Sequence, residues 1–191
     1  MSLPIKSTKR IIFTGLLIAI GILFSTVLHI IPTNLPGSMF SPLHLPVFIC
    51  AIICGRRYGI VCGLLMPYIS FLTMGMPPIY PVAIAMSIEL IVYAAVCATV
   101  FNFNWFKDNI MIRAFFSILI AQLIGRFAGG ISTALLLGYG GKEYLFSTFV
   151  VSYFINTWIA IVIQLVIIPP IVKKTNEYLL FREKTTYTNS Q

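Results

Sequence analysis

Long apolar runs, separated by short polar or charged segments, make up most of the 191-residue sequence. Several runs are about 20 residues long, the length at which an α-helix crosses the hydrocarbon core of a bilayer. The polar, proline and glycine positions between them predict six transmembrane helices within a single domain, residues 1–191. The fold class expected is all-α, a polytopic membrane protein. The expected helices span residues 11–31, 44–54, 60–74, 82–101, 110–138 and 147–172.

Basic residues cluster at alternate ends of these segments. Eleven of the 13 lysines and arginines then lie on one face of the membrane, while Lys142 lies on the other and Arg126 lies inside a predicted helix. Cytoplasmic loops are enriched in lysine and arginine, so both termini are expected in the cytoplasm. The eleven are Lys6, Lys9, Arg10, Arg56, Arg57, Lys107, Arg113, Lys173, Lys174, Arg182 and Lys184.

Composition supports a membrane protein and argues against a nucleic-acid-binding one. The chain is 59% hydrophobic and only 9% charged, with a mean hydropathy of +0.96. These values are typical of integral membrane proteins. In a soluble protein the net charge of +8 would suggest nucleic acid. Here the basic residues follow the expected topology, so the bilayer, and not nucleic acid, is the expected partner.

The sequence contains no recognisable set of catalytic or metal-binding residues. It has no Walker A sequence, no Gly-x-Ser-x-Gly and no His-Glu-x-x-His. Its four cysteines lie in apolar surroundings without the spacing of zinc ligands, so we expect them to be packing residues. We therefore predict a protein that is not an enzyme and that has neither a metal site nor a cofactor. The cysteines are Cys50, Cys54, Cys62 and Cys97.

Two charged residues, Glu89 and Arg126, lie well inside predicted helices. A charge at mid-membrane depth costs about 2.5–3.5 kcal/mol on insertion scales, so such residues are usually paired or functional. One interpretation is a permanent ion pair between the two. In the other, Arg126 receives an anionic or strongly polar group of a ligand, and Glu89 positions that ligand or binds its hydroxyl or amide groups. Arginine suits a carboxylate because its planar fork donates two parallel hydrogen bonds.

Other polar and aromatic residues fall on the same helix faces. Tyr93 lies one turn from Glu89, and Gln122 lies one turn from Arg126. Hydrogen bonds between helices remain an alternative role for Gln122 and Asn156, and ordinary packing one for Tyr153. The candidate substrate-binding residues are Arg126, Glu89, Asn156, Tyr93, Tyr153, Gln122 and Tyr68.

Two further features concern the surface of the helix bundle. The expected outer loops, residues 32–42 and 75–81, contain apolar side chains, which suggests lids over an outward-facing pocket or, alternatively, anchors in the membrane interface. In the first segment, Gly15 and Ala19 are four residues apart. Small residues at this spacing let helices approach closely, either within the bundle or against a partner subunit.

Residues 39–96, from MFSPLHLPVF to ELIVYAAV, resemble the substrate-binding S-components of energy-coupling factor (ECF) vitamin transporters. The basic amino terminus, the Gly15/Ala19 pair, the six-segment plan and the ending IQLVIIPPIV are similar too. The resemblance implies a bacterial cell-membrane protein that captures a water-soluble vitamin from outside. It also implies docking, through the Gly15/Ala19 face, on a transmembrane T-subunit with two ATPases, which agrees with the missing nucleotide motif.

Within this family the pattern is most similar to the pantothenate-specific branch. That resemblance implies that Arg126 meets the carboxylate, while Glu89 and Asn156 meet the hydroxyl and amide groups. The hydroxymethylpyrimidine, niacin and folate branches share the architecture and remain alternatives. So do a structural membrane protein without a transport role and a secondary carrier that works without ATPases.

Overall fold

The computed structural model describes residues 7–30, 42–103, 109–141 and 145–188, and every regular element in these ranges is helical. The prediction of an all-α fold with six helical segments is confirmed, because α6, η3 and α7 together form the sixth segment. The elements are α1 Ser7–Ile30, α2 His44–Ile53, α3 Arg56–Met74, η2 Ile79–Ala83, α4 Ile84–Asn102, α5 Ile110–Tyr139, α6 Phe146–Val150, η3 Val151–Ile155 and α7 Trp158–Thr188, where η2 and η3 are π-helical.

Five segments of the described chain are long and apolar enough to cross a membrane. The remaining helix, α2, has only 10 residues and is too short to cross alone. The structure therefore supports the expected polytopic membrane protein. The five segments span Ser7–Leu28, Arg56–Met74, Ile79–Asn102, Ile110–Tyr139 and Phe146–Tyr178.

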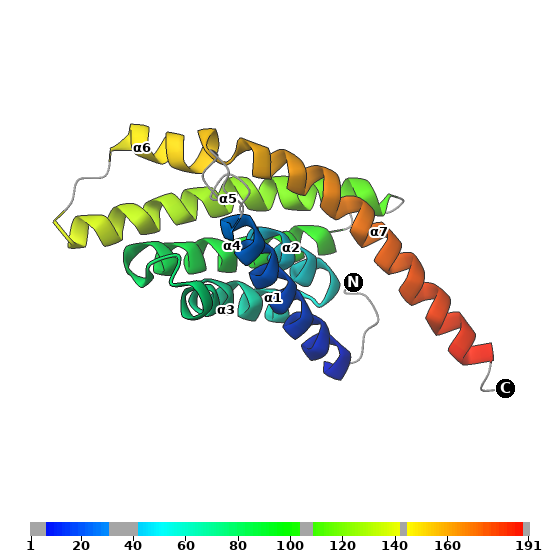
Figure 1. Cartoon of the computed structure of the whole chain (residues 1–191). Helices are drawn as coiled ribbons and strands as arrows, with labels where there is room; N and C mark the ends of the chain where they lie inside the picture. The colour runs from blue at the N-terminus through cyan, green and yellow to red at the C-terminus, as the bar shows by residue number, and fades with distance from the viewer. Residues whose placement is uncertain (1–6, 31–41, 104–108, 142–144, 189–191) are drawn as a thin grey trace.

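The longer helices lie side by side in the order α3, α4, α5, α7 (Figure 1). Helix α2 packs against α3, α4 and α7, while α1 crosses obliquely over α2 and α3. The start of α1 and the end of α7 lie toward the same end of the bundle (Figure 1).

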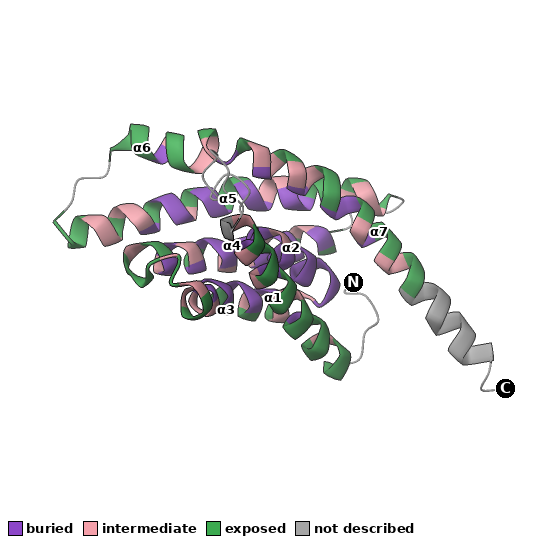
Figure 2. Cartoon of the chain, in the orientation of Figure 1, coloured by how far each residue is buried: buried purple, intermediate pink, exposed green. Residues whose placement is uncertain are grey.

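Burial differs sharply between the first two helices (Figure 2). In α2, nine of the ten residues are buried, including Phe48 and Ile52, so this short helix forms the centre of the core. In α1, by contrast, large apolar side chains such as Leu16 and Leu23 are exposed. An exposed apolar helix face in a membrane protein meets lipid or another subunit.

Local sequence explains where several helices begin and end. Pro46 lies in the first turn of α2, where its missing N–H costs no helical hydrogen bond. Gly55 has φ 98° and joins α2 to α3, and Gly75 has φ 72° at the end of α3. Both backbone conformations favour glycine because other residues are strained there. Asn109 caps α5 by accepting hydrogen bonds from the backbone N–H groups of Met111 and Ile112.

The last segment differs from the continuous helix expected at residues 147–172. It is interrupted by η3 and by a turn at residues 156–157, and α7 then continues through Pro169 and Pro170 to Thr188. Proline removes a backbone donor, but its fixed φ is compatible with a helix. Transmembrane helices tolerate proline because neighbouring groups satisfy the freed carbonyls.

Candidate functional site

Glu89 lies in a buried cluster formed by α4 and the start of α2. Its side chain is only 5% exposed, and its Oε1 accepts a hydrogen bond of 2.5 Å from the hydroxyl of Tyr93, one turn further along α4. The Nε2 atom of His44, the first residue of α2, lies 3.8 Å from the same oxygen. The rings of His44 and Tyr93 are also in contact, with centroids 5.4 Å apart. The short helix α2 therefore brings a titratable side chain to the carboxylate.

Two glycines of α5 make room for this cluster. A Cβ atom on Gly125 would lie 2.3 Å from the ring of Tyr93, and one on Gly129 would lie 3.1 Å from Cδ of Glu89. The ring of Tyr153, from η3, approaches Gly129 at 2.9 Å by the same measure. Glu89, Tyr93 and Tyr153 thus pack directly on the glycine face of α5.

Arg126 lies on α5 between these two glycines and is 2% exposed. Its Nη1 atom donates to the backbone carbonyl of Tyr153 and, at 2.5 Å, to Oγ1 of Thr157. The Thr157 hydroxyl in turn donates to the Tyr153 carbonyl at 2.7 Å. The carbonyl is available here because the helix breaks after η3; irregular backbone at membrane depth requires such compensating partners.

Glu89 and Arg126 do not form an ion pair with each other in the described part of the chain. His44 is the only basic residue within ion-pair distance of Glu89 there, and Arg126 donates only to the two oxygens named above. The Nε atom of Arg126 and Nδ1 of His44 are buried without a hydrogen-bond partner among the described residues. The direct ion pair considered from the sequence is therefore absent between these two side chains.

Gln122 faces a different partner. Its Nε2 donates to Oε1 of Gln164 on α7 at 2.8 Å, and both side chains are 2% exposed. Gln122 Oε1 and Gln164 Nε2 are buried without a partner among the described residues. This bond is of the interhelical kind weighed as the alternative role for Gln122.

The other candidate residues are less closely connected to the cluster. Asn156 lies in the turn between η3 and α7, and Tyr68 is half-buried on α3. In the described chain neither side chain makes a hydrogen bond or ring contact with the cluster. Gly15 and Ala19 are exposed on α1, away from the buried core.

Of the two expected lids, residues 75–81 are described and are anchored to the bundle. The hydroxyl of Tyr80 donates to the carbonyl of Leu136 on α5, and Ser70 donates to the carbonyl of Met76 at 2.8 Å. These bonds attach the segment of residues 75–81 to α5 through Tyr80 and to α3 through Met76. The other expected lid, residues 32–42, lies outside the described residues except for Pro42.

Two residues of the cluster were absent from the candidate set: His44 and Thr133. The Thr133 hydroxyl lies 2.8 Å from that of Tyr153, and Thr133 follows Gly129 by one helical turn. Extending the Arg126 face by a further turn would have found it. His44 stood at the predicted outer boundary of its segment, but no sequence pattern linked it to Glu89.

Comparison with known families places this geometry in context. A family model described as ECF transporter, substrate-specific component, matches residues 9–172, most of the chain. The chain belongs to this family. As an ECF S-component it is a multi-pass protein of the cell membrane and a binding subunit of a transporter, not an enzyme. S-components work with a substrate and with the ECF module. No curated protein and no solved structure matched the chain.

Proposed function

We propose that this S-component captures an anionic, hydroxyl-bearing vitamin from outside, with pantothenate as the leading candidate. It would deliver the vitamin inward by docking on a T-subunit driven by two ATPases. The observation that carries the proposal is the buried guanidinium of Arg126, which has no carboxylate within ion-pair distance in the described chain. A buried charge without a counterion is costly, and an anionic ligand supplies that counterion.

The unused edge of the Arg126 guanidinium suits a carboxylate. The hydrogen bonds to Tyr153 and Thr157 both come from Nη1. Nε is buried without a hydrogen-bond partner among the described residues. Nε and Nη2 together form the fork that binds a carboxylate through two parallel hydrogen bonds. Nη1 meanwhile holds the guanidinium in place, so its orientation is set before the ligand arrives.

The Glu89 side of the cluster suits a donor group. Oε1 of Glu89 is occupied by Tyr93, whereas Oε2 accepts no hydrogen bond from the described residues. A ligand hydroxyl or amide N–H can donate to this oxygen. The cluster thus combines a guanidinium that can bind a carboxylate with a carboxylate oxygen that can accept a hydrogen bond. This pair fits a molecule that carries a carboxylate together with hydroxyl and amide groups. Pantothenate has this combination, whereas nicotinate lacks the hydroxyls and hydroxymethylpyrimidine lacks the carboxylate.

A calorimetric titration of the purified protein tests the assignment. Pantothenate is expected to give a binding signal, and nicotinate, folate and hydroxymethylpyrimidine much weaker signals or none. Preference for one of these three would reassign the substrate while preserving the S-component function. Uptake of the vitamin by cells that lack the ATPase module would instead favour a secondary carrier.

The docking surface is proposed to be the Gly15/Ala19 face of α1. A Cβ atom on Gly15 would meet no other atom within 4 Å, so this face is open to a partner helix. Small residues at four-residue spacing permit the close approach that such docking requires.

Gly15→Leu is expected to reduce co-purification with the T-subunit and ATPases by roughly tenfold or more, since a bulky side chain would separate the helices. Vitamin binding by the isolated subunit should not change, because Gly15 is exposed and a Cβ atom on it would meet no other residue within 4 Å. Gly138→Leu is the matched control, since a Cβ there also meets nothing within 4 Å. Equal loss of assembly in both variants would contradict this docking surface.

A further inference from the structure

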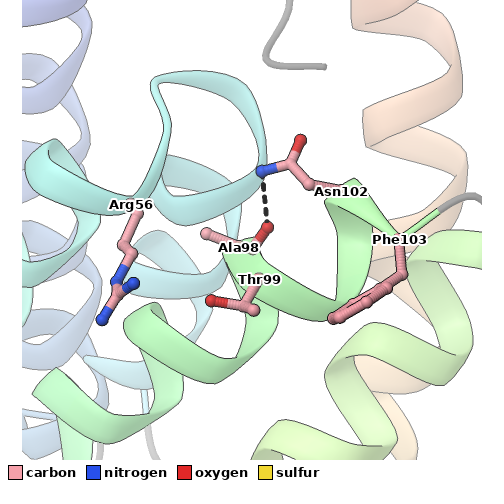
Figure 3. Close-up of a pocket in the computed structure, with 5 residues that line it drawn as sticks. All are labelled: Arg56, Ala98, Thr99, Asn102 and Phe103. Atoms are coloured by element: carbon pink, nitrogen blue, oxygen red, sulfur yellow. Dashed lines mark hydrogen bonds between the residues drawn. The ribbon is translucent and has the colours of Figure 1, made fainter.

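A pocket of about 330 Å³ lies between the start of α3 and the end of α4 (Figure 3). Arg56 borders it from α3, and the other residues that line it come from the last turns of α4 and the residue after them. The described residues that line it are Arg56, Ala98, Thr99, Asn102 and Phe103. Arg56 begins one segment that is long and apolar enough to cross a membrane, and Asn102 ends another. The ends of such segments are expected at the level of the lipid headgroups.

The pocket carries a positive charge that nothing in the described chain neutralises. Arg56 is exposed and makes no hydrogen bond or ion pair with a described residue. The acidic residues that the structure describes are committed elsewhere: Glu89 to the buried cluster and Glu177 to Lys173 at 4.0 Å. Arg113, on α5, stacks instead on the ring of Phe101 at 4.2 Å. An anion for Arg56 must therefore come from outside the described protein.

The backbone at the start of α3 also favours an anion. Helix α3 begins at Arg56, directly after Gly55, and no side chain caps its amino end. Its first N–H groups and the helix dipole therefore add to the charge of Arg56. At the opposite wall, Asn102 donates to the carbonyl of Ala98 at 2.8 Å, as Figure 3 shows.

The apolar rim distinguishes among possible anions. Phe103 is 55% exposed beside the pocket, so it offers an apolar surface next to the charged one. A phospholipid presents the same pair of groups, a phosphate and an adjoining glycerol and acyl chain. We propose that this pocket binds the phosphate of an anionic membrane phospholipid, with Arg56 and the start of α3 on the phosphate and Phe103 against the apolar part. The site is independent of the vitamin-binding cluster.

Native mass spectrometry of the detergent-purified protein with added phosphatidylglycerol tests this site. Arg56→Gln is expected to weaken the first lipid-binding event roughly tenfold, because a charge-assisted hydrogen bond is lost. Thr99→Trp should weaken it similarly by filling the pocket while Arg56 remains. Arg57→Gln is the matched control: it removes the same charge from the next position, which does not line the pocket, and should change binding by less than about twofold.

Several outcomes would overturn the proposal. Equal weakening by Arg56→Gln and Arg57→Gln would indicate diffuse attraction to the basic face and no defined site. Binding of glycerol 3-phosphate as tight as that of phosphatidylglycerol would indicate a free phosphate ligand. Unchanged lipid binding in Arg56→Gln, with weaker assembly on the T-subunit, would assign the pocket to a protein partner.

Discussion

Arg126→Gln is expected to weaken pantothenate binding by about 100-fold, equivalent to about 3 kcal/mol, as measured by calorimetric titration. The variant removes the charge that would face the ligand carboxylate and leaves that carboxylate desolvated and unpaired. The fold should survive, because a glutamine can still donate to Thr157 or to the Tyr153 carbonyl. Removal of a buried charge also relieves its desolvation cost, so the midpoint of thermal unfolding should stay level or rise.

The alcohol pantothenol provides the chemical control, since a CH₂OH group replaces the carboxylate of pantothenate. The native protein should prefer pantothenate strongly, and Arg126→Gln should remove most of that preference. Arg126→Lys should retain part of the affinity, because it keeps the charge but lacks the planar fork. If Arg126→Gln weakened both ligands equally, Arg126 would be a structural residue, and the proposed carboxylate contact would be wrong.

Gly125→Ala is expected to lower the free energy of unfolding by about 1–3 kcal/mol, the usual cost of overpacking a filled core. The added Cβ would lie 2.3 and 2.4 Å from two ring atoms of Tyr93, a residue with 0% exposure. The ring cannot swing aside freely, because its hydroxyl is bound to Glu89 at 2.5 Å. Thermal unfolding in detergent measures the loss, and vitamin affinity should fall with it because Glu89 is displaced.

Gly15→Ala supplies the matched comparison, because a Cβ on Gly15 meets nothing within 4 Å. That variant should be as stable as the native protein or slightly more stable, since alanine favours helix over glycine. Combining Gly125→Ala with Tyr93→Leu should cost less than the sum of the two single changes, because the clash is then removed. A Gly125→Ala protein as stable as Gly15→Ala would refute the close packing of α4 on α5.

The local part of the candidate site could be predicted from the sequence. Glu89 and Tyr93 are one turn apart on the same helix, so helical periodicity places them together, and the structure shows the hydrogen bond between them. The same reasoning associated Gln122 with Arg126, but there a residue of another helix, Gln164, is the partner. Periodicity indicates which residues share a face and says nothing of what that face meets.

The contacts of Arg126 and His44 required the tertiary structure. Arg126 binds the Tyr153 carbonyl, which is available because the sixth segment breaks at η3, and no proline or glycine in residues 146–157 marks that break. His44 meets Glu89 because the short helix α2 begins beside α4 within the core. Such contacts depend on how non-neighbouring helices are placed.

By itself, the sequence determined that the chain is an all-α membrane protein, where its first five helices run to within a few residues, and that Glu89 and Arg126 need an explanation. These properties follow from hydrophobic length and from the cost of a charge in lipid, which act on each segment separately. The tertiary structure alone decided that these two side chains do not pair with each other, and that Nη1 of Arg126 instead donates to the Tyr153 carbonyl and to Thr157. That outcome depends on side chains and backbone from α2, α4, α5, η3 and the turn after η3 meeting in one place, which no single segment encodes.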